Sequence, residues 1–309
     1  RVRRIIIAGR VLAVFGAQLR RGGKADMQAW DFTDYPAPQG LYMDEQYQFA
    51  ALGHNDQNMV AIIGDSHAHQ YQQSVAKLLQ SRSASSELPK VIFVNYLSPS
   101  DFARIESATA KIEKDQTIKT VILSEYWAIK RGSDKINYAI RCCGAGLMQT
   151  LGEGHRVAPF TDSQNDAANK SLESEIAALK KTGKKVYVIL DNPFGEELAP
   201  RSLLDRSLFR KIEITVVPLS KKDAIERDEP TRSSIIKVAH DAGAVIIDPF
   251  EYLCDQDTCP ALSADGSPIY KDYDHLSLYA VTHMVHYLDF IAGDTRAADG
   301  GTPPSEAVR

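Results

Sequence analysis

Five short, mainly apolar segments alternate with helix-like segments along the chain, and this pattern restricts the fold more than any other feature. The apolar segments are residues 58–63, 90–95, 120–123, 185–190 and 244–247. The segments predicted as helices are residues 68–79, 100–114, 165–182, 231–241 and 276–291. Strands that are apolar on both faces are typical of a parallel sheet buried between helices. The chain is therefore predicted to have an α/β fold.

Charge and hydropathy argue against two classes of protein. The 309 residues include 36 Lys and Arg against 40 Asp and Glu, which gives a net charge of −4. Proteins that coat nucleic acid usually have a strongly basic domain, so we expect no nucleic-acid partner. No run of 18 or more uncharged apolar residues occurs, so the sequence predicts no complete transmembrane helix of its own.

Residues 5–19 allow three interpretations. They are apolar apart from Arg10, Gln18 and two glycines, and basic residues flank them on both sides. A helix of this length spans about 22 Å, less than the ~30 Å of a hydrocarbon core. Arg10 also interrupts the apolar run that a signal peptide requires. The segment is a buried strand or helix, a signal peptide, or the trailing end of a membrane segment that begins before Arg1.

The four cysteines form two close pairs. Cys254 and Cys259 enclose four residues, and such a short loop suits a disulfide in an oxidising compartment. Half of a zinc site is the alternative, although no well-spaced second pair of ligands lies nearby. Cys142 and Cys143 are adjacent, and we interpret them as buried thiols or as partners of other groups.

A candidate nucleophile follows the first apolar segment. Residues 64–67 read Gly-Asp-Ser-His, and ligands of open parallel sheets bind beyond the carboxyl ends of the strands. Gly64 allows a tight turn, and Ser66 is expected at a helix N-terminus, where backbone N–H groups can stabilise an oxyanion. The alternative is that Ser66 only caps the helix.

A candidate base lies near the other end of the chain, just before the last predicted helix. A serine nucleophile needs a base, and the base needs a carboxylate that orients it. His275 and Asp272, three positions earlier, can supply both from one loop. Asp274 is expected to point elsewhere if the loop begins to turn helical. The alternative is that Asp274 or Ser277 caps the helix and that His275 is a polar surface residue. Two such clusters are more specific together than either is alone.

These clusters resemble the SGNH (GDSL-like) hydrolases and acyltransferases. The resemblance rests on residues 64–68, on the loop between Cys254 and Cys259, and on residues 270–277, and it covers residues 58–292. It is closer still to the SGNH domains fused behind acyltransferase-3 membrane domains. The resemblance implies a flavodoxin-like three-layer α/β/α sandwich with a central parallel sheet.

The resemblance also implies roles for individual residues. It makes Ser66 the nucleophile, His275 the base and Asp272 the group that orients the base. The Gly-x-Asn-Asp block expected after the third strand is missing, and Asn95 and Ser124 are candidate oxyanion or substrate-binding residues instead. We expect no cofactor. His67 and His69 form a His-x-His pair without partners at metal-ligand spacing, so we also expect no metal site.

The resemblance further implies an organisation for the chain. Residues 1–57 are expected to be a membrane-proximal or linker segment, 58–292 the SGNH domain, and 293–309 a tail. The expected function is O-acetyl transfer to a cell-envelope polysaccharide, with an acyltransferase-3 domain upstream as partner and a glycan as acceptor. The expected location is the periplasmic face of a bacterial inner membrane. A carbohydrate O-acetylesterase with the same triad is the alternative, followed by a glycan-binding module of weak activity.

Overall fold

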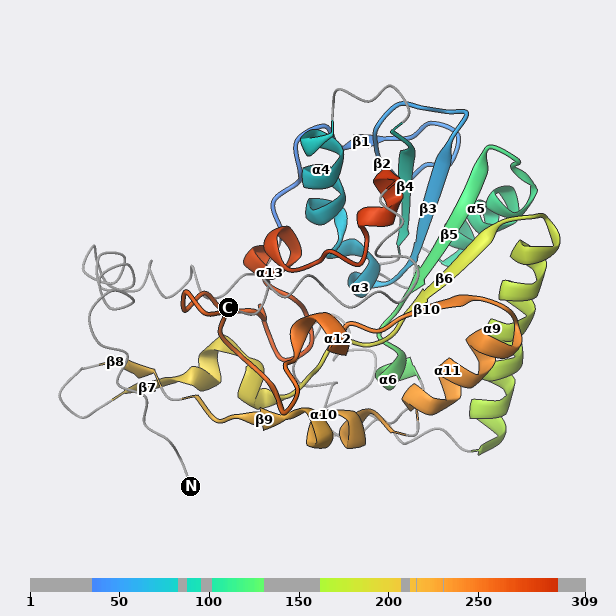
Figure 1. The fold of residues 1–309 in the computed structure, drawn as a ribbon. Helices are drawn as coiled ribbons and strands as arrows, with labels where there is room; N and C mark the ends of the chain where they lie inside the picture. The colour runs from blue at the N-terminus through green and yellow to red at the C-terminus, as the bar shows by residue number, and fades with distance from the viewer. Residues whose placement is uncertain are drawn as a thin grey trace.

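A mixed sheet lies at the centre of the fold (Figure 1). The computed structural model describes residues 35–82, 88–95, 102–130, 162–206, 212–214, 216–229 and 231–293. Within these ranges seven strands form the sheet, in the order β1-β2-β4-β3-β5-β6-β10. The strands are β1 (Tyr42–Met43), β2 (Ala50–Leu52), β3 (Met59–Gly64), β4 (Lys90–Asn95), β5 (Ile118–Ser124), β6 (Lys185–Ile189) and β10 (Val245–Ile247).

The five strands from β4 to β10 in this order are parallel and follow a known topology. Strand β3 pairs in parallel with both β4 and β5, β5 pairs with β6, and β6 pairs with β10. Numbered among themselves in chain order, these strands lie in the order 2-1-3-4-5, which is that of flavodoxin. The predicted flavodoxin-like α/β fold is confirmed.

Helices cover both faces of the sheet, and each face has its own core. Helices α3 (Ser66–His69), α4 (Gln72–Ser81), α12 (Phe250–Leu253) and α13 (Leu278–His283) lie on one side; α5 (Phe102–Lys114), α9 (Asp162–Lys181) and α11 (Thr231–Asp241) lie on the other (Figure 1). In β3, Val60 and Ile62 belong to the first core, whereas Ala61 and Ile63 belong to the second. Burial on both faces explains why this strand is apolar along its length.

Smaller elements complete the described part of the chain. They are α6 (Trp127–Lys130), α10 (Lys221–Asp228), the 3₁₀ turns η2 (Glu196–Leu198), η3 (Pro200–Leu203) and η4 (Asp289–Ala292), and two pairs of short strands, β7 (Leu204–Arg206) with β8 (Ile212–Ile214) and β9 (Leu219–Ser220) with β11 (Thr258–Cys259). None of the helices in the described ranges is long and apolar enough to cross a membrane. Residues 5–19, Cys142, Cys143 and the tail beyond Gly293 lie outside the described residues.

The segment expected to be a linker contributes to the sheet. Strand β2 pairs antiparallel with β4, and β1 pairs antiparallel with β2. Ala51 and Leu52 are buried there. Strands of two and three residues are too short to show a periodic pattern, so they could not be predicted from hydrophobic periodicity. The sheet therefore includes residues that precede residue 58.

The predicted final helix is wrong in its length. Helix α13 ends at His283 and is followed by the 3₁₀ turn η4, so residues 276–291 do not form one helix. The interruption brings Tyr287 into the core, where its hydroxyl donates a hydrogen bond to that of Tyr71 at 3.0 Å. Tertiary packing of a large side chain overrides the helical pattern here.

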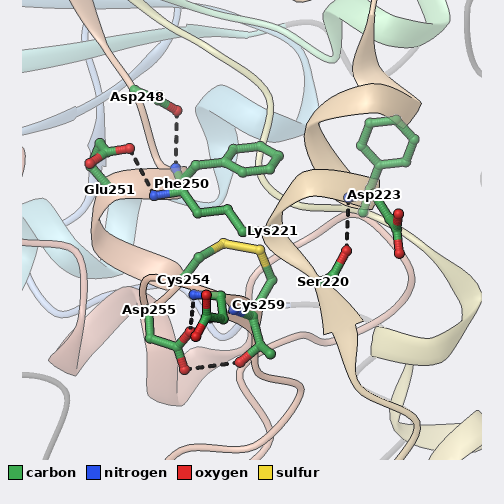
Figure 2. Close-up of a disulfide and its surroundings, with 12 residues drawn as sticks. Ser220, Lys221, Asp223, Asp248, Phe250, Glu251, Cys254, Asp255 and Cys259 are labelled. Atoms are coloured by element: carbon green, nitrogen blue, oxygen red, sulfur yellow. Dashed lines mark hydrogen bonds and ion pairs between the residues drawn. A yellow bond between two sulfur atoms is a disulfide. The ribbon is translucent and has the colours of Figure 1, made fainter.

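A disulfide joins Cys254 to Cys259, and it lies between α12 and β11 (Figure 2). Asp255 braces the same loop because one of its carboxylate oxygens accepts the N–H groups of Asp257 and Thr258, at 2.8 and 2.6 Å. The loop is thus closed by a covalent bond and by turn hydrogen bonds together. Because the two sulfur atoms are bonded to each other, Cys254 and Cys259 do not form half of a zinc site in this structure.

Removing this disulfide is expected to lower stability moderately. The bond closes a loop with a sequence separation of 5, and the chain-entropy relation gives about 2 kcal/mol for so short a loop. The free energy of unfolding of the Cys254→Ser/Cys259→Ser double variant should therefore be lower by about 2 kcal/mol, and its urea midpoint should fall accordingly. The oxidised wild type in the same titration is the reference, and an unchanged midpoint would contradict the expectation.

Replacing Gly64 is expected to destabilise the protein far more. A Cβ atom on Gly64 would lie 1.7 Å from the carbonyl oxygen of Ser124 on the paired strand. Backbone atoms of two central strands cannot separate cheaply, so Gly64→Ala should cost at least about 3 kcal/mol in the free energy of unfolding. Gly183→Ala is the control because nothing lies within 4 Å there, although its φ of +85° still costs about 1 kcal/mol. Equal losses would refute the steric argument.

Candidate active site

The turn after β3 presents Ser66 at the carboxyl end of the sheet. Strand β3 is flanked by β4 and β5, so this turn lies at the topological switch point where ligands of such folds bind. Asp65 caps α3, and its Oδ1 accepts the backbone N–H of His67 at 2.9 Å. Its Oδ2 accepts the N–H of Tyr126 at 2.9 Å. One carboxylate thus joins the turn that carries Ser66 to the loop after β5.

The loop before α13 brings a histidine to this turn. The Nε2 atom of His275 lies 2.8 Å from Oγ of Ser66, across 209 positions of sequence. The Nδ1 atom of the same ring lies 3.0 Å from Oδ2 of Asp272. With the proton of the neutral imidazole on Nδ1 and donated to Asp272, Nε2 is free to accept the Ser66 hydroxyl.

Hydrogen bonds hold this loop in place from several sides. Oδ1 of Asp272 accepts the backbone N–H groups of His275 and Asp274 at 2.8 and 3.1 Å. The side chain of Gln70, in the segment between α3 and α4, accepts the N–H of Leu276 at 3.0 Å. Asn192, beyond the end of β6, donates from Nδ2 to the carbonyl of Asp274 at 3.1 Å. The imidazole of His275 is therefore carried by a loop that is fixed to both the nucleophile turn and the sheet.

Asp274 does not lie where the sequence analysis expected it. Its side chain is 1% exposed, and its Oδ1 lies 2.8 Å from Nδ1 of His275. The cap of α13 is Ser277, which accepts the N–H of Ala280 at 3.1 Å. The interpretation of Asp274 as a helix cap is wrong, because the loop places the carboxylates of both Asp272 and Asp274 against Nδ1 of the same imidazole.

The two carboxylates control the charge of His275. Burial lowers the pKa of His275, but Asp274 and Asp272 outweigh burial and raise it to about 10. Burial likewise raises the pKa of Asp274, whereas His275 and His67 lower it more, to well below its usual value. These two pKa shifts favour an ionised Asp274 beside a protonated His275.

His67 is a member of the site that the sequence analysis treated as an ordinary histidine. Its ring stacks on that of Tyr126 with centroids 4.8 Å apart and planes 8° apart. Its Nε2 lies 3.6 Å from Oδ2 of Asp274, and both side chains are almost fully buried. Its position directly after the serine is the signal that could have pointed to it.

His67, Asp274 and His275 have ligand atoms within 4.8 Å of one another, as a metal site would. Both ring nitrogens of His275 are already engaged, by Ser66 and by Asp272. His67 and Asp274 remain as two ligands, and protein zinc sites use three or four. The donor set of these residues is therefore one ligand short of a zinc site.

Asn95 and Ser124 lie on either side of Gly64. Asn95 ends β4 and Ser124 ends β5, and each is the register partner of Gly64 on its own side of β3. Both side chains are buried. Burial raises the pKa of Tyr71, and a hydrogen bond from Ser124 is among the interactions that oppose this rise. Asn95 and Ser124 both remain candidates for a second oxyanion donor, because they end the strands on either side of the turn that carries Ser66.

A serine hydroxyl, an imidazole and a carboxylate in hydrogen-bonded sequence, at the end of a flavodoxin-like sheet, are typical of serine hydrolases and acyltransferases. A family model described as "SGNH domain (fused to AT3 domains)" matches residues 35–289. The chain therefore belongs to this SGNH family, and the resemblance stated from the sequence is confirmed. A comparison with curated proteins found no match.

The two hydrogen bonds of Asp65 lead to a prediction. Asn at this position keeps one acceptor oxygen, so the N–H of either His67 or Tyr126 faces an amide donor instead. Asp65→Asn should lower the free energy of unfolding by about 1–3 kcal/mol in a thermal or urea titration. Asp223→Asn, an exposed position on α10, should stay within about 0.5 kcal/mol of wild type. Equal stability of the two variants would contradict this account.

Proposed function

We propose that the chain is an O-acetyltransferase domain that acetylates a cell-envelope polysaccharide through an acetyl-Ser66 intermediate. The observation that carries the proposal is the sequence of contacts from Ser66 to His275 to Asp272, with Oγ–Nε2 at 2.8 Å and Nδ1–Oδ2 at 3.0 Å. Ser66 is partly exposed, so its hydroxyl can meet a substrate. The family description, which names fusion to AT3 domains, supports transfer from a membrane-borne acyl donor.

In the first half of the proposed reaction, Oγ of Ser66 attacks the carbonyl carbon of the acetyl donor. The hydroxyl proton moves to Nε2 of His275, and Asp272 stabilises the imidazolium through Nδ1. Collapse of the tetrahedral intermediate breaks the bond to the leaving group, which takes the proton from Nε2. We assign the backbone N–H of Ser66 as one donor to the oxyanion, and the side chain of Asn95 or Ser124 as the second.

In the second half, a sugar hydroxyl attacks the acetyl-serine. His275 takes the proton of that hydroxyl and returns it to Oγ of Ser66 as the ester bond breaks. The products are the acetylated sugar and free Ser66. Water in place of the sugar would give acetate, which is the esterase alternative, and both reactions use the same residues. A glycan-binding module would keep the fold without either reaction.

The proposed setting is the periplasmic side of a bacterial inner membrane, with the acyltransferase-3 domain upstream in the same chain. The disulfide at Cys254–Cys259 supports an oxidising compartment. The family description supports the membrane partner.

The proposal predicts covalent labelling and loss of turnover. A fluorophosphonate probe should modify Ser66, as mapped by peptide mass spectrometry. Ser66→Ala and His275→Ala should each lower the hydrolysis of p-nitrophenyl acetate by about 10³-fold or more. Asp272→Asn should lower it by up to about 10⁴-fold because the imidazole loses its preferred tautomer. Ser220→Ala, which removes the cap of α10, should retain labelling and turnover.

The acceptor separates the two enzymatic functions. With p-nitrophenyl acetate and an oligosaccharide of the envelope, mass spectrometry should detect an acetylated oligosaccharide in a Ser66-dependent reaction. Acetate alone would favour the esterase, and the absence of both products, with no label on Ser66, would leave only the binding module.

A further inference from the structure

A second imidazole–carboxylate pair lies directly behind the proposed triad. The side chains of His67 and Asp274 are 3% and 1% exposed, and Nε2 of His67 is 3.6 Å from Oδ2 of Asp274. Nε2 of His67 and both carboxylate oxygens of Asp274 are buried without a hydrogen-bond partner among the described residues. The triad described above makes no use of this pair.

A buried carboxylate without hydrogen bonds needs a positive charge beside it. Removing an ionised carboxylate from water costs several kcal/mol unless a cation compensates it. Two imidazoles touch Asp274, that of His275 at 2.8 Å and that of His67 at 3.6 Å. The rings of these two histidines have centroids 4.8 Å apart. A proton on either ring compensates the same carboxylate.

The position of that proton decides whether Ser66 can be activated. A protonated His275 cannot accept the proton of the Ser66 hydroxyl. Asp272 and Asp274 together favour a protonated His275, since an opposite charge within about 4–6 Å stabilises the charged form. A proton on His67 instead satisfies Asp274 and leaves His275 facing Asp272 alone. Groups coupled this closely titrate as one unit with two arrangements of the proton.

We propose that His67 is a positioning residue for the base: protonated His67 pairs with Asp274, and this leaves His275 neutral, hydrogen-bonded to Asp272, and able to take the proton of Ser66. This inference rests on the proposed function because it assumes that His275 activates Ser66; the contacts of His67 and Asp274 do not depend on that reaction. The pair sets the pH range over which Ser66 is activated, and Asp274 is the group through which His67 acts on His275.

Other titratable groups around His275 are less suited to this role. Burial raises the pKa of Tyr35, whose hydroxyl donates to the carbonyl of Leu276. Burial and Asp228 raise the pKa of Asp191 well above its usual value. The carboxylate of Asp65 is held by two backbone N–H groups, and Lys271 lies over the ring of Tyr35, 4.5 Å from its centroid.

Two further side chains complete the surroundings. Tyr126 stacks on His67, and His69 lies on the same short helix as His67, 6.2 Å from the ring of Tyr35. Asp274 contacts Nδ1 of His275, and His67 contacts Asp274, so these two residues form the pair beside the base.

The test is the pH dependence of kcat/KM for p-nitrophenyl acetate, measured with the 309-residue chain in the presence of EDTA. Asp274→Asn removes a charge that holds the proton on His275, so the acidic limb of the profile should move to lower pH by about one unit or more. His67→Gln keeps a hydrogen-bond donor but removes the compensating charge. Its acidic limb should move to higher pH by about one unit, with an approximately tenfold loss of activity below the limb.

The double variant tests whether His67 acts through Asp274. In the Asp274→Asn background, His67→Gln should no longer move the acidic limb of the pH profile, because the carboxylate that His67 compensates is absent. A uniform loss of turnover at every pH, or the same shift in both backgrounds, would overturn the proposal. His240→Gln, at a side chain of α11 that is 83% exposed, should leave the profile unchanged.

A second measurement does not depend on turnover. NMR titration of histidine-labelled protein should show the ring of His275 titrating at lower pH in Asp274→Asn and at higher pH in His67→Gln than in wild type. These shifts without Ser66-dependent turnover would refute the proposed function and leave the pair established. Ser66-dependent turnover with an unshifted His275 ring would refute the pair alone.

Discussion

The contact between Ser66 and His275 is the interaction on which the site depends. It joins two segments 209 positions apart: Ser66 begins the four-residue helix α3, and His275 lies in the loop before α13. Its geometry is therefore held by surrounding hydrogen bonds rather than by a long helix or strand. Gln70 holds Leu276, and Asn192 holds the carbonyl of Asp274.

Much of the fold could be predicted from the sequence because the sheet is buried on both faces. Strand β4 has the predicted bounds Lys90–Asn95, and β3 differs from its prediction by one residue at each end. Continuous apolar runs identify such strands. The short edge strands β1 and β2 lack this signal, and the core contact of Tyr287 that interrupts the last helix is a tertiary effect that no local pattern contains.

The candidate site could be predicted in part for a similar reason. Ser66, His275 and Asp272 occur in two short clusters whose residue types have a joint chemical meaning, and the structure brings them together, while their catalytic roles stay predictions. The burial of Asp274 depends on the path of a loop, and the contact of His67 with it depends on both segments at once. One sequence without the fold cannot show that a histidine beside the serine faces a carboxylate beside the base.

The contact of Tyr35 with the loop before α13 has a consequence for how substrates could reach the site. Its hydroxyl donates to the carbonyl of Leu276, the residue after His275, and Lys271 lies over its ring. Tyr35, the first residue that the structure describes, thus lies beside the loop that carries the base. An acyl donor tethered to the chain at this point would have a raised effective concentration at Ser66, because tethering makes the encounter intramolecular.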